Sequence, residues 1–271
     1  MKKYISQLLL IPVLACLASL SCYLAPERDN ANDYANEGIP VPAIRYTFED
    51  DSINMLDKII HDVGNAGYHL DGSIDQSLIN YFDESALQGQ SKSISLFDEN
   101  SSINIPGTPY PVDFDEGDFS IVIIAKNNGQ DPWGALISKI GGTTSETLAG
   151  WCLRLDSAMH ELILEAGETT MISPVASIST SGIFGIQSWH VIAATFDNTN
   201  AKWSVYLDDL SNTGNVSSYF PGSNSLTIGH SDTMNLEGQR SGFGGTMKFD
   251  AVMIYDYVLE AGQVEEIYNS L

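Results

Sequence analysis

The stretch WHVIAATFD, residues 189–197, is followed after a short polar segment by WSVYLDD, residues 203–209. Both are rich in β-branched and aromatic residues, and the first is apolar at consecutive positions. Short runs of this kind, without a helical period, are typical of strands that are buried on both faces. FSIVIIA (119–125) and FDAVMIYDYVL (249–259) have the same character. The sequence therefore predicts several strands in the interior of a layered β structure.

Other segments alternate apolar and polar residues with a period of two, which is the pattern of a strand that buries one face. IRYTFE (residues 44–49) shows it, and so does WCLRLD (151–156). ELILE (161–165) follows four residues after the latter segment, so the sequence predicts a β-hairpin across Ser157–His160.

Helical spacing of apolar residues is confined to the C-terminal tail. The i, i+3, i+4, i+7 pattern there consists of Val264, Ile267, Tyr268 and Leu271. Many strands separated by turn residues, with one short C-terminal helix, predict an all-β fold, namely a two-sheet antiparallel β-sandwich. Residues 43–271 are enough for one such domain and show no repeat of fixed period.

The N-terminus has the features of a secretory signal peptide, because two lysines precede an apolar run that continues to about Leu20. LASLSC (residues 17–22) resembles the lipobox of bacterial lipoproteins, in the looser form of the Bacteroidetes. This resemblance implies a lipoprotein signal peptide over residues 1–21 and a lipidated Cys22. A signal peptide that is cut elsewhere is the alternative. A multiply acylated cysteine would give stable membrane attachment.

The chain is strongly acidic, with a formal net charge of −23 at pH 7. This charge argues against binding to nucleic acids and to anionic membrane surfaces, so we expect membrane contact through the lipid anchor only. Residues 22–42 are polar, acidic and flanked by proline, which predicts a flexible tether. The acidic residues Glu27, Asp29 and Asp33 favour the cell surface over the periplasmic face of the outer membrane.

The order of motifs across residues 43–271 resembles that of the LamG-like jelly-roll family, within the concanavalin A-like lectin/glucanase fold. The resemblance rests on YTFEDD (46–51), HDVGNAGYHL (61–70), SISLFDENSSINIP (93–106), GDFSIVIIAKN (117–127), QSWHVIAATFD with WSVYLDD (187–209), SLTIG (225–229) and the closing FGGTMKFDAVMIYDYVLEAGQVEEIY (243–268). The chain departs from the family at Ile124, where tryptophan is usual, and at Asp209, where glycine is usual. The resemblance implies a concanavalin A-like jelly roll.

Glucanases of this fold carry an acid–x–Asp–x–acid pattern on one strand, and retaining hydrolysis needs two carboxylates about 5–5.5 Å apart. ELILE places Glu161 and Glu165 on one strand face, but Ile163 stands where the central aspartate would be. The two glutamates are roughly 13 Å apart along a strand, at about 3.3 Å per residue. We therefore expect no enzyme activity, and a diverged glycoside hydrolase is the third candidate function.

The family resemblance also implies a structural calcium between the first and last strands. Ca²⁺ takes six to eight oxygen ligands. Asp250 occupies the matching position, and Glu49 and Asp62 lie in the segments expected to supply its partners. The alternative is that Asp250 is an ordinary strand-end aspartate, bonded to a neighbouring turn.

Lectins of this fold bind glycans with loops at one edge or with the concave sheet. Aromatic faces meet the C–H side of a sugar and polar groups meet its hydroxyls. The aromatic residues in loop-like sequence are Tyr110, Trp133, Tyr219 and Phe220, although each could instead pin its loop to the sandwich. The sequence thus predicts a non-catalytic, carbohydrate-binding lipoprotein of the cell envelope. A protein-binding or adhesion module of the same fold is the alternative.

Overall fold

The computed structural model describes residues 40–49, 53–54, 59–64, 70–74, 79–87, 90–96, 102–105, 117–127, 134–140, 149–156, 160–168, 171–181, 188–216, 225–234, 240–242 and 247–271. Within these ranges, none of the helices combines the length and the apolar character needed to cross a membrane.

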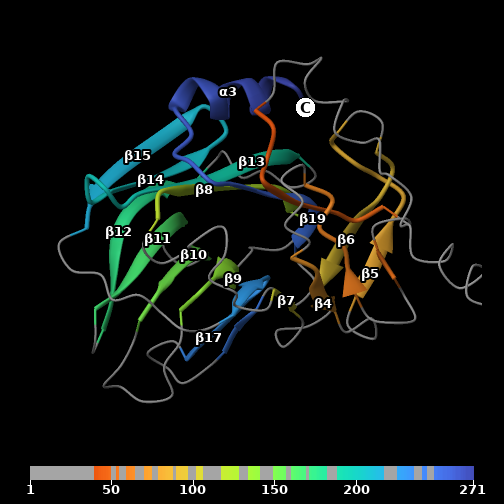
Figure 1. Ribbon diagram of the computed structural model, residues 1–271, viewed down its shortest axis with the longest axis horizontal. Helices are drawn as coiled ribbons and strands as arrows, with labels where there is room; N and C mark the ends of the chain where they lie inside the picture. Colours follow the sequence, from red (N-terminus) through yellow and green to blue (C-terminus); the bar gives the residue numbers. More distant parts are fainter. Residues whose placement is uncertain are drawn as a thin grey trace, which may run out of the picture.

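Two antiparallel sheets form the domain and stack as the layers of a sandwich (Figure 1). In spatial order, the eight-stranded sheet consists of β15 (Leu210–Asn215), β14 (Lys202–Leu207), β13 (Trp189–Asp197), β8 (Phe119–Asn127), β19 (Met247–Tyr255), β6 (Ser93–Leu96) and β5 (Ile79–Phe82), with β1 (Ile44–Thr47) paired to β19. The nine-stranded sheet consists of β12 (Met171–Ser179), β11 (Glu161–Glu168), β10 (Trp151–Asp156), β9 (Gly134–Ser138), β16 (Leu226–Ile228), β7 (Ile103–Ile105), β4 (Gly72–Ile74), β3 (Ile59–Ile60) and β2 (Ile53–Asn54).

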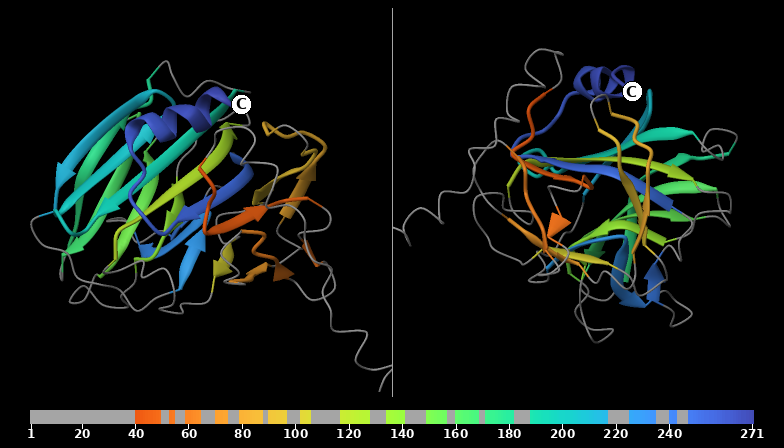
Figure 2. Two further views of the ribbon diagram at one scale, coloured as in Figure 1. Left: turned by 45° about the horizontal axis from the view of Figure 1, so that its top comes forward. Right: turned by 90° about the vertical axis from the view of Figure 1, so that its right-hand side faces the viewer.

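Two smaller elements lie on opposite sides of this sandwich (Figure 2). The helix α3 (Ala261–Asn269) covers the outer face of the eight-stranded sheet. The hairpin of β17 (His230–Met234) and β18 (Arg240–Gly242) lies beside β9, at the side of the nine-stranded sheet.

The space between the sheets is filled by side chains from both. On β10, Trp151, Leu153 and Leu155 point into this core, so the residues between them face outward. Phe196 of β13 stacks on Phe119 of β8, with ring centroids 4.2 Å apart, and its ring lies 4.8 Å from that of Trp151. Because Trp151 belongs to the other sheet, this ring cluster joins the two layers.

The strands β8 and β19 are buried along their whole length, because their outer face is covered as well. Val122 and Ile124 of β8 share an apolar cluster with Val264 and Ile267 of α3. This double burial is the physical reason for the continuous apolar run at residues 119–125.

The fold predicted from the sequence is confirmed, as a two-sheet β-sandwich with a short C-terminal helix. The pairing of β10 with β11 is also as predicted, with Asp156 opposite Glu161. The helix α3 begins after Glu260, which forms a capping box with Gln263.

Candidate functional site

The predicted sugar-contacting aromatics and the predicted lipidation site lie outside the described residues. They are Cys22, Tyr110, Trp133, Tyr219 and Phe220. Their roles stay predictions, so the candidate site consists of side chains that the structure describes.

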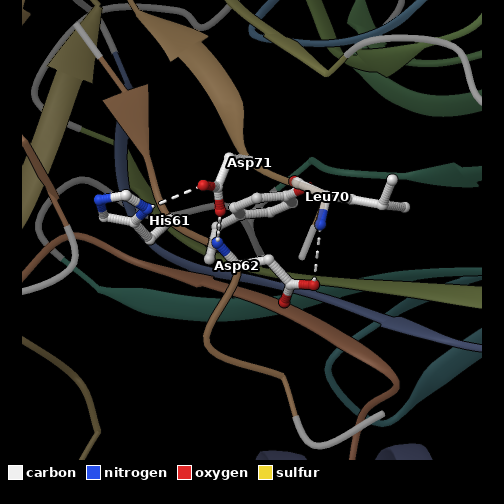
Figure 3. A network of polar contacts seen from close by, with 5 residues as sticks. His61, Asp62, Leu70 and Asp71 are labelled. Atoms are coloured by element: carbon white, nitrogen blue, oxygen red, sulfur yellow. Dashed lines mark hydrogen bonds and ion pairs between the residues drawn. The ribbon is translucent and has the colours of Figure 1, made fainter. Parts of the chain in front are cut away.

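Asp62, a predicted calcium ligand, organises the turn that follows β3 (Figure 3). Its Oδ1 accepts hydrogen bonds from the backbone N–H groups of Arg45 at 2.9 Å and Gly64 at 2.8 Å, and its Oδ2 accepts one from Leu70 at 3.3 Å. Burial raises the pKa of Asp62, and this effect is larger than that of the three hydrogen bonds, which lower the pKa. A Cβ on Gly64 would lie 2.5 Å from the carbonyl oxygen of Ala43, so only glycine allows this turn to approach β1 so closely.

A second carboxylate supports this turn. Asp71 accepts a hydrogen bond from the backbone N–H of Asp62 at 3.0 Å, and its other oxygen lies 2.9 Å from Nδ1 of His61 (Figure 3). The hydroxyl of Tyr46 donates to the carbonyl oxygen of Leu70. Both oxygens of Asp62 therefore already have backbone partners, and its role as a calcium ligand stays a prediction.

Asp250, the second predicted calcium ligand, stands at an irregularity of β19, where the pairing with β8 shifts by one residue. Its side chain is fully buried. Oδ2 accepts hydrogen bonds from the backbone N–H groups of Ala86 at 3.1 Å and Leu87 at 3.3 Å. Oδ1 is buried without a hydrogen-bond partner. Burial above all, with a contribution from the charge of Glu49, raises the pKa of Asp250 to about 6, although hydrogen bonds from the Ser85 side chain and from the backbone of Ala86 and Leu87 lower it.

Glu49, the third predicted ligand, thus lies within electrostatic range of Asp250. Its Oε1 accepts hydrogen bonds from the backbone N–H groups of Ser91 at 2.7 Å and Lys92 at 2.8 Å. The charge of Glu49 therefore contributes to the raised pKa of Asp250, and the role of both residues as calcium ligands stays a prediction. No cluster of three or more His, Cys, Asp or Glu side chains suited to a metal occurs in the described part of the chain. A cation here would therefore take most of its ligands from backbone oxygens and water.

A charged triad lies on the outer face of the nine-stranded sheet. Arg154 of β10 donates to Oδ2 of Asp156 at 3.0 Å and to Oε1 of Glu165 at 2.9 Å. Their side chains keep exposed fractions of 24%, 13% and 10%, so the triad is held in place and still reaches solvent. Burial alone would lower the pKa of Arg154. The two carboxylates raise it by more, and Glu165 contributes more than Asp156, so the guanidinium stays charged.

Polar side chains continue across the same face from the other edge of the sheet. The cross-strand partners there are Ser73, Asn104, Thr227 and Ser138. Ser73 and Asn104 are exposed, whereas Thr227 and Ser138 are buried, next to the β17–β18 hairpin. The exposed members of this row, Ser73 and Asn104, carry donors and acceptors that are suited to hydrogen bonding with the hydroxyl groups of a sugar.

The triad is a site that the sequence did not reveal, although the alternation of WCLRLD already put Arg154 and Asp156 on one face. The missing information was that Glu165 reaches the guanidinium from β11. The sequence pattern grouped Glu165 instead with Glu161, as a glucanase-like pair. In the structure it is ion-paired to Arg154.

The fold defines the chain as a two-sheet β-sandwich module. Residues 97–265 match the family Laminin_G_3, described as the Concanavalin A-like lectin/glucanases superfamily. This match covers more than half of the chain, and the chain belongs to this family.

Individual relatives are more distant. The chain is 31% identical over 86 residues to the rat (Rattus norvegicus) protein "Sushi, von Willebrand factor type A, EGF and pentraxin domain-containing protein 1", which is 30% of this chain and 2% of that protein. The binding domain of Paraclostridial Mosquitocidal Protein 1 superposes with a TM-score of 0.59 at 17% identity, over 85% of this chain and 52% of that one. A Trypanosoma rangeli sialidase superposes with a TM-score of 0.56 at 12% identity, over 83% of this chain and 32% of that one. At these identities the structural likeness concerns the fold alone.

Proposed function

We propose that this protein is a non-catalytic carbohydrate-binding module, tethered to the outer membrane through Cys22 and facing the cell surface. The observation that carries the proposal is the triad of Arg154, Asp156 and Glu165 on the outer sheet face, where these side chains are 24%, 13% and 10% exposed. Its carboxylates accept hydrogen bonds from sugar hydroxyls, and its guanidinium donates to them. Ion pairing fixes these groups in advance, which lowers the entropy cost of binding.

Two features support binding without catalysis. Ile163 occupies the central position of ELILE, where the glucanase pattern has an aspartate. The carboxylate of Glu165 is engaged in an ion pair with Arg154, 2.9 Å away. The face therefore offers fixed polar groups without the acid and nucleophile pair of a retaining glycosidase.

The proposal predicts that Asp156→Asn and Arg154→Gln weaken glycan binding at least tenfold, because each removes a charged group from the triad. The measurement is binding of the chain from residue 23 onward, which keeps every described residue, to a panel of neutral polysaccharides. Lys202→Met, at an exposed lysine on β14, is the control and leaves binding unchanged. Trp133→Ala and Tyr219→Ala, measured alongside, test the loop aromatics.

Failure of every neutral glycan to bind would contradict this proposal and favour the protein-interaction alternative. Binding that survives both triad substitutions but is lost in Trp133→Ala would keep the glycan function and move its site to the loops.

We further propose a structural calcium held by Asp250 and Glu49 together with backbone oxygens. Its support is Oδ1 of Asp250, a buried oxygen without a hydrogen-bond partner that lies near a second carboxylate. A divalent cation would neutralise both acidic groups and link the last strand to the segment that follows β1.

The calcium proposal predicts opposite effects of Asp250→Asn with and without the ion. At pH 7 in chelator, we expect the variant to be at least as stable as the wild type. The pKa of Asp250 is about 6 in the folded protein, above its ordinary value of 3.8, so the wild type loses stability as the pH rises from about 4 to 7 and this carboxyl ionises. In calcium the wild type gains about 2–3 kcal/mol at a hundredfold excess over Kd and the variant gains nothing. Urea unfolding in both buffers measures this. Equal gains in both proteins would exclude Asp250 as a ligand.

A further inference from the structure

Two lysines stand side by side on the outer face of the eight-stranded sheet. Lys126 of β8 is the cross-strand partner of Lys248 of β19, and Trp189 of β13 is the next residue in the same row. The side chains of this lysine pair are only 7% and 8% exposed. Like charges directly opposite one another destabilise a sheet, and buried charges require partners, so this arrangement needs anions nearby.

Glu84 supplies one such anion. It belongs to residues 83–87, a strap that follows β5 and is fixed to β19 by the bonds from Ala86 and Leu87 to Asp250. One oxygen of Glu84 accepts a hydrogen bond from Lys126 at 2.6 Å, and the other accepts one from Lys248. Burial raises the pKa of Glu84, but the bonds and charges of both lysines together lower it.

One carboxylate balances one of the two ammonium charges, and each ammonium group donates one of its three hydrogens to it. Among the described residues, Glu84 is the one carboxylate that forms an ion pair with either amine, and two aromatic rings also lie close to the amines. Nζ of Lys126 lies 5.1 Å from the ring centre of Trp189, and Nζ of Lys248 lies 3.8 Å from that of Phe82. Rings attract a cation but carry no counter-charge. The lysine pair therefore retains surplus positive charge and spare donors, in a chain whose net charge is −23.

We propose that the lysine pair binds the carboxylate of an acidic sugar, at a site separate from the triad on the opposite sheet. Glu84 demonstrates that a carboxylate can span the two amines, and its side chain is 32% exposed, so the cluster reaches solvent beside it. Trp189, which is half-buried and lies beside Lys126, is the aromatic side chain that would contact the sugar ring. The carboxylate preference follows from the lysine pair itself, whereas the sugar as its carrier rests on the proposed glycan-binding function.

Calorimetric titration at pH 7 and low salt tests the proposal with three probes, namely a galacturonate trimer, sodium acetate and a neutral galactose trimer. We expect the galacturonate trimer to bind, acetate to bind more weakly, and the neutral trimer not to bind at this site. Lys248→Met and Lys126→Met each weaken galacturonate binding at least tenfold. Lys202→Met is the matched control and changes nothing.

Glu84→Gln distinguishes most directly between a carboxylate-binding lysine pair and a purely structural ion pair. Removing the carboxylate raises the surplus charge of the cluster by one, and we expect galacturonate to bind about tenfold more tightly. A purely structural Glu84 would leave the affinity unchanged. If this variant does not fold, the wild type and the two methionine variants still decide the matter.

Two results would overturn the proposal: no binding of either carboxylate probe at millimolar concentration, or galacturonate binding that persists in both methionine variants. If neutral polysaccharides bind through the triad and galacturonate does not bind, the proposal for the lysine pair is wrong and the triad site stands. Galacturonate binding through the lysines without any neutral glycan binding would instead contradict the site proposed on the nine-stranded sheet.

Discussion

Phe196→Ala is expected to lower the free energy of unfolding by about 4 kcal/mol, a larger loss than we expect from any other substitution proposed for this protein. Phe196 is fully buried, and its ring lies 4.2 Å from Phe119, 4.8 Å from Trp151 and 4.9 Å from Trp203, measured between centroids. Three large rings cannot all move into the space of the missing one, so a cavity remains between the two sheets. Urea unfolding gives the change as a lower midpoint with an unchanged slope.

Phe196→Leu is the graded control, because it keeps most of the apolar volume and should cost about 1–1.5 kcal/mol. Lys202→Met is the surface control, since Lys202 is exposed on β14, and it should stay within about 0.5 kcal/mol of the wild type. A loss below about 1 kcal/mol in Phe196→Ala would show that this ring cluster does not hold the sheets together.

The strands were predictable because each pattern reports a local environment. WCLRLD alternates since β10 has a core face and an outer face, and FSIVIIA is continuously apolar since the inter-sheet core and α3 cover both faces of β8. Period and composition carry that information within a single segment. The C-terminal helix was predictable for the same reason, because its apolar stripe is local.

Charged contacts between distant strands were not predictable in this way. Lys126 and Lys248 are neighbours only because β8 pairs with β19 in one particular register, and no local pattern specifies that register. Glu84 then reaches them from a third segment. The triad has the same origin, since Glu165 meets Arg154 across the β10–β11 pair.

The arrangement of the predicted calcium ligands could be predicted from the sequence only in part. The family resemblance implies that Asp250 and Glu49 supply ligands to one calcium ion, and the charge of Glu49 contributes to the raised pKa of Asp250. Asp62 was grouped with them from the motif HDVGN, but a motif does not tell which atoms an aspartate binds. Backbone N–H groups that converge on a turn use the same carboxylate oxygens as a cation would.

Asp62→Ala is expected to cost about 3 kcal/mol, the second largest effect. It leaves the buried N–H groups of Arg45 and Leu70 and the half-buried N–H of Gly64 without their acceptor, and each unsatisfied group costs about 1 kcal/mol or more. The loss of the buried charge offsets part of this cost, because burial raises the pKa of Asp62. Urea unfolding at pH 7 in chelator measures it, and an effect below about 1 kcal/mol would contradict the assigned contacts.

Asp62→Asn separates the turn from the metal. An amide oxygen in the place of Oδ1 keeps the bonds from Arg45 and Gly64 and loses only the one from Leu70, so a cost of about 1 kcal/mol is expected. Because those oxygens serve the backbone, the calcium-dependent gain in stability should persist in this variant and vanish in Asp250→Asn. Its loss in Asp62→Asn would place Asp62 among the calcium ligands, as the sequence predicts, and would mean that the ion replaces at least one of the backbone bonds to this carboxylate.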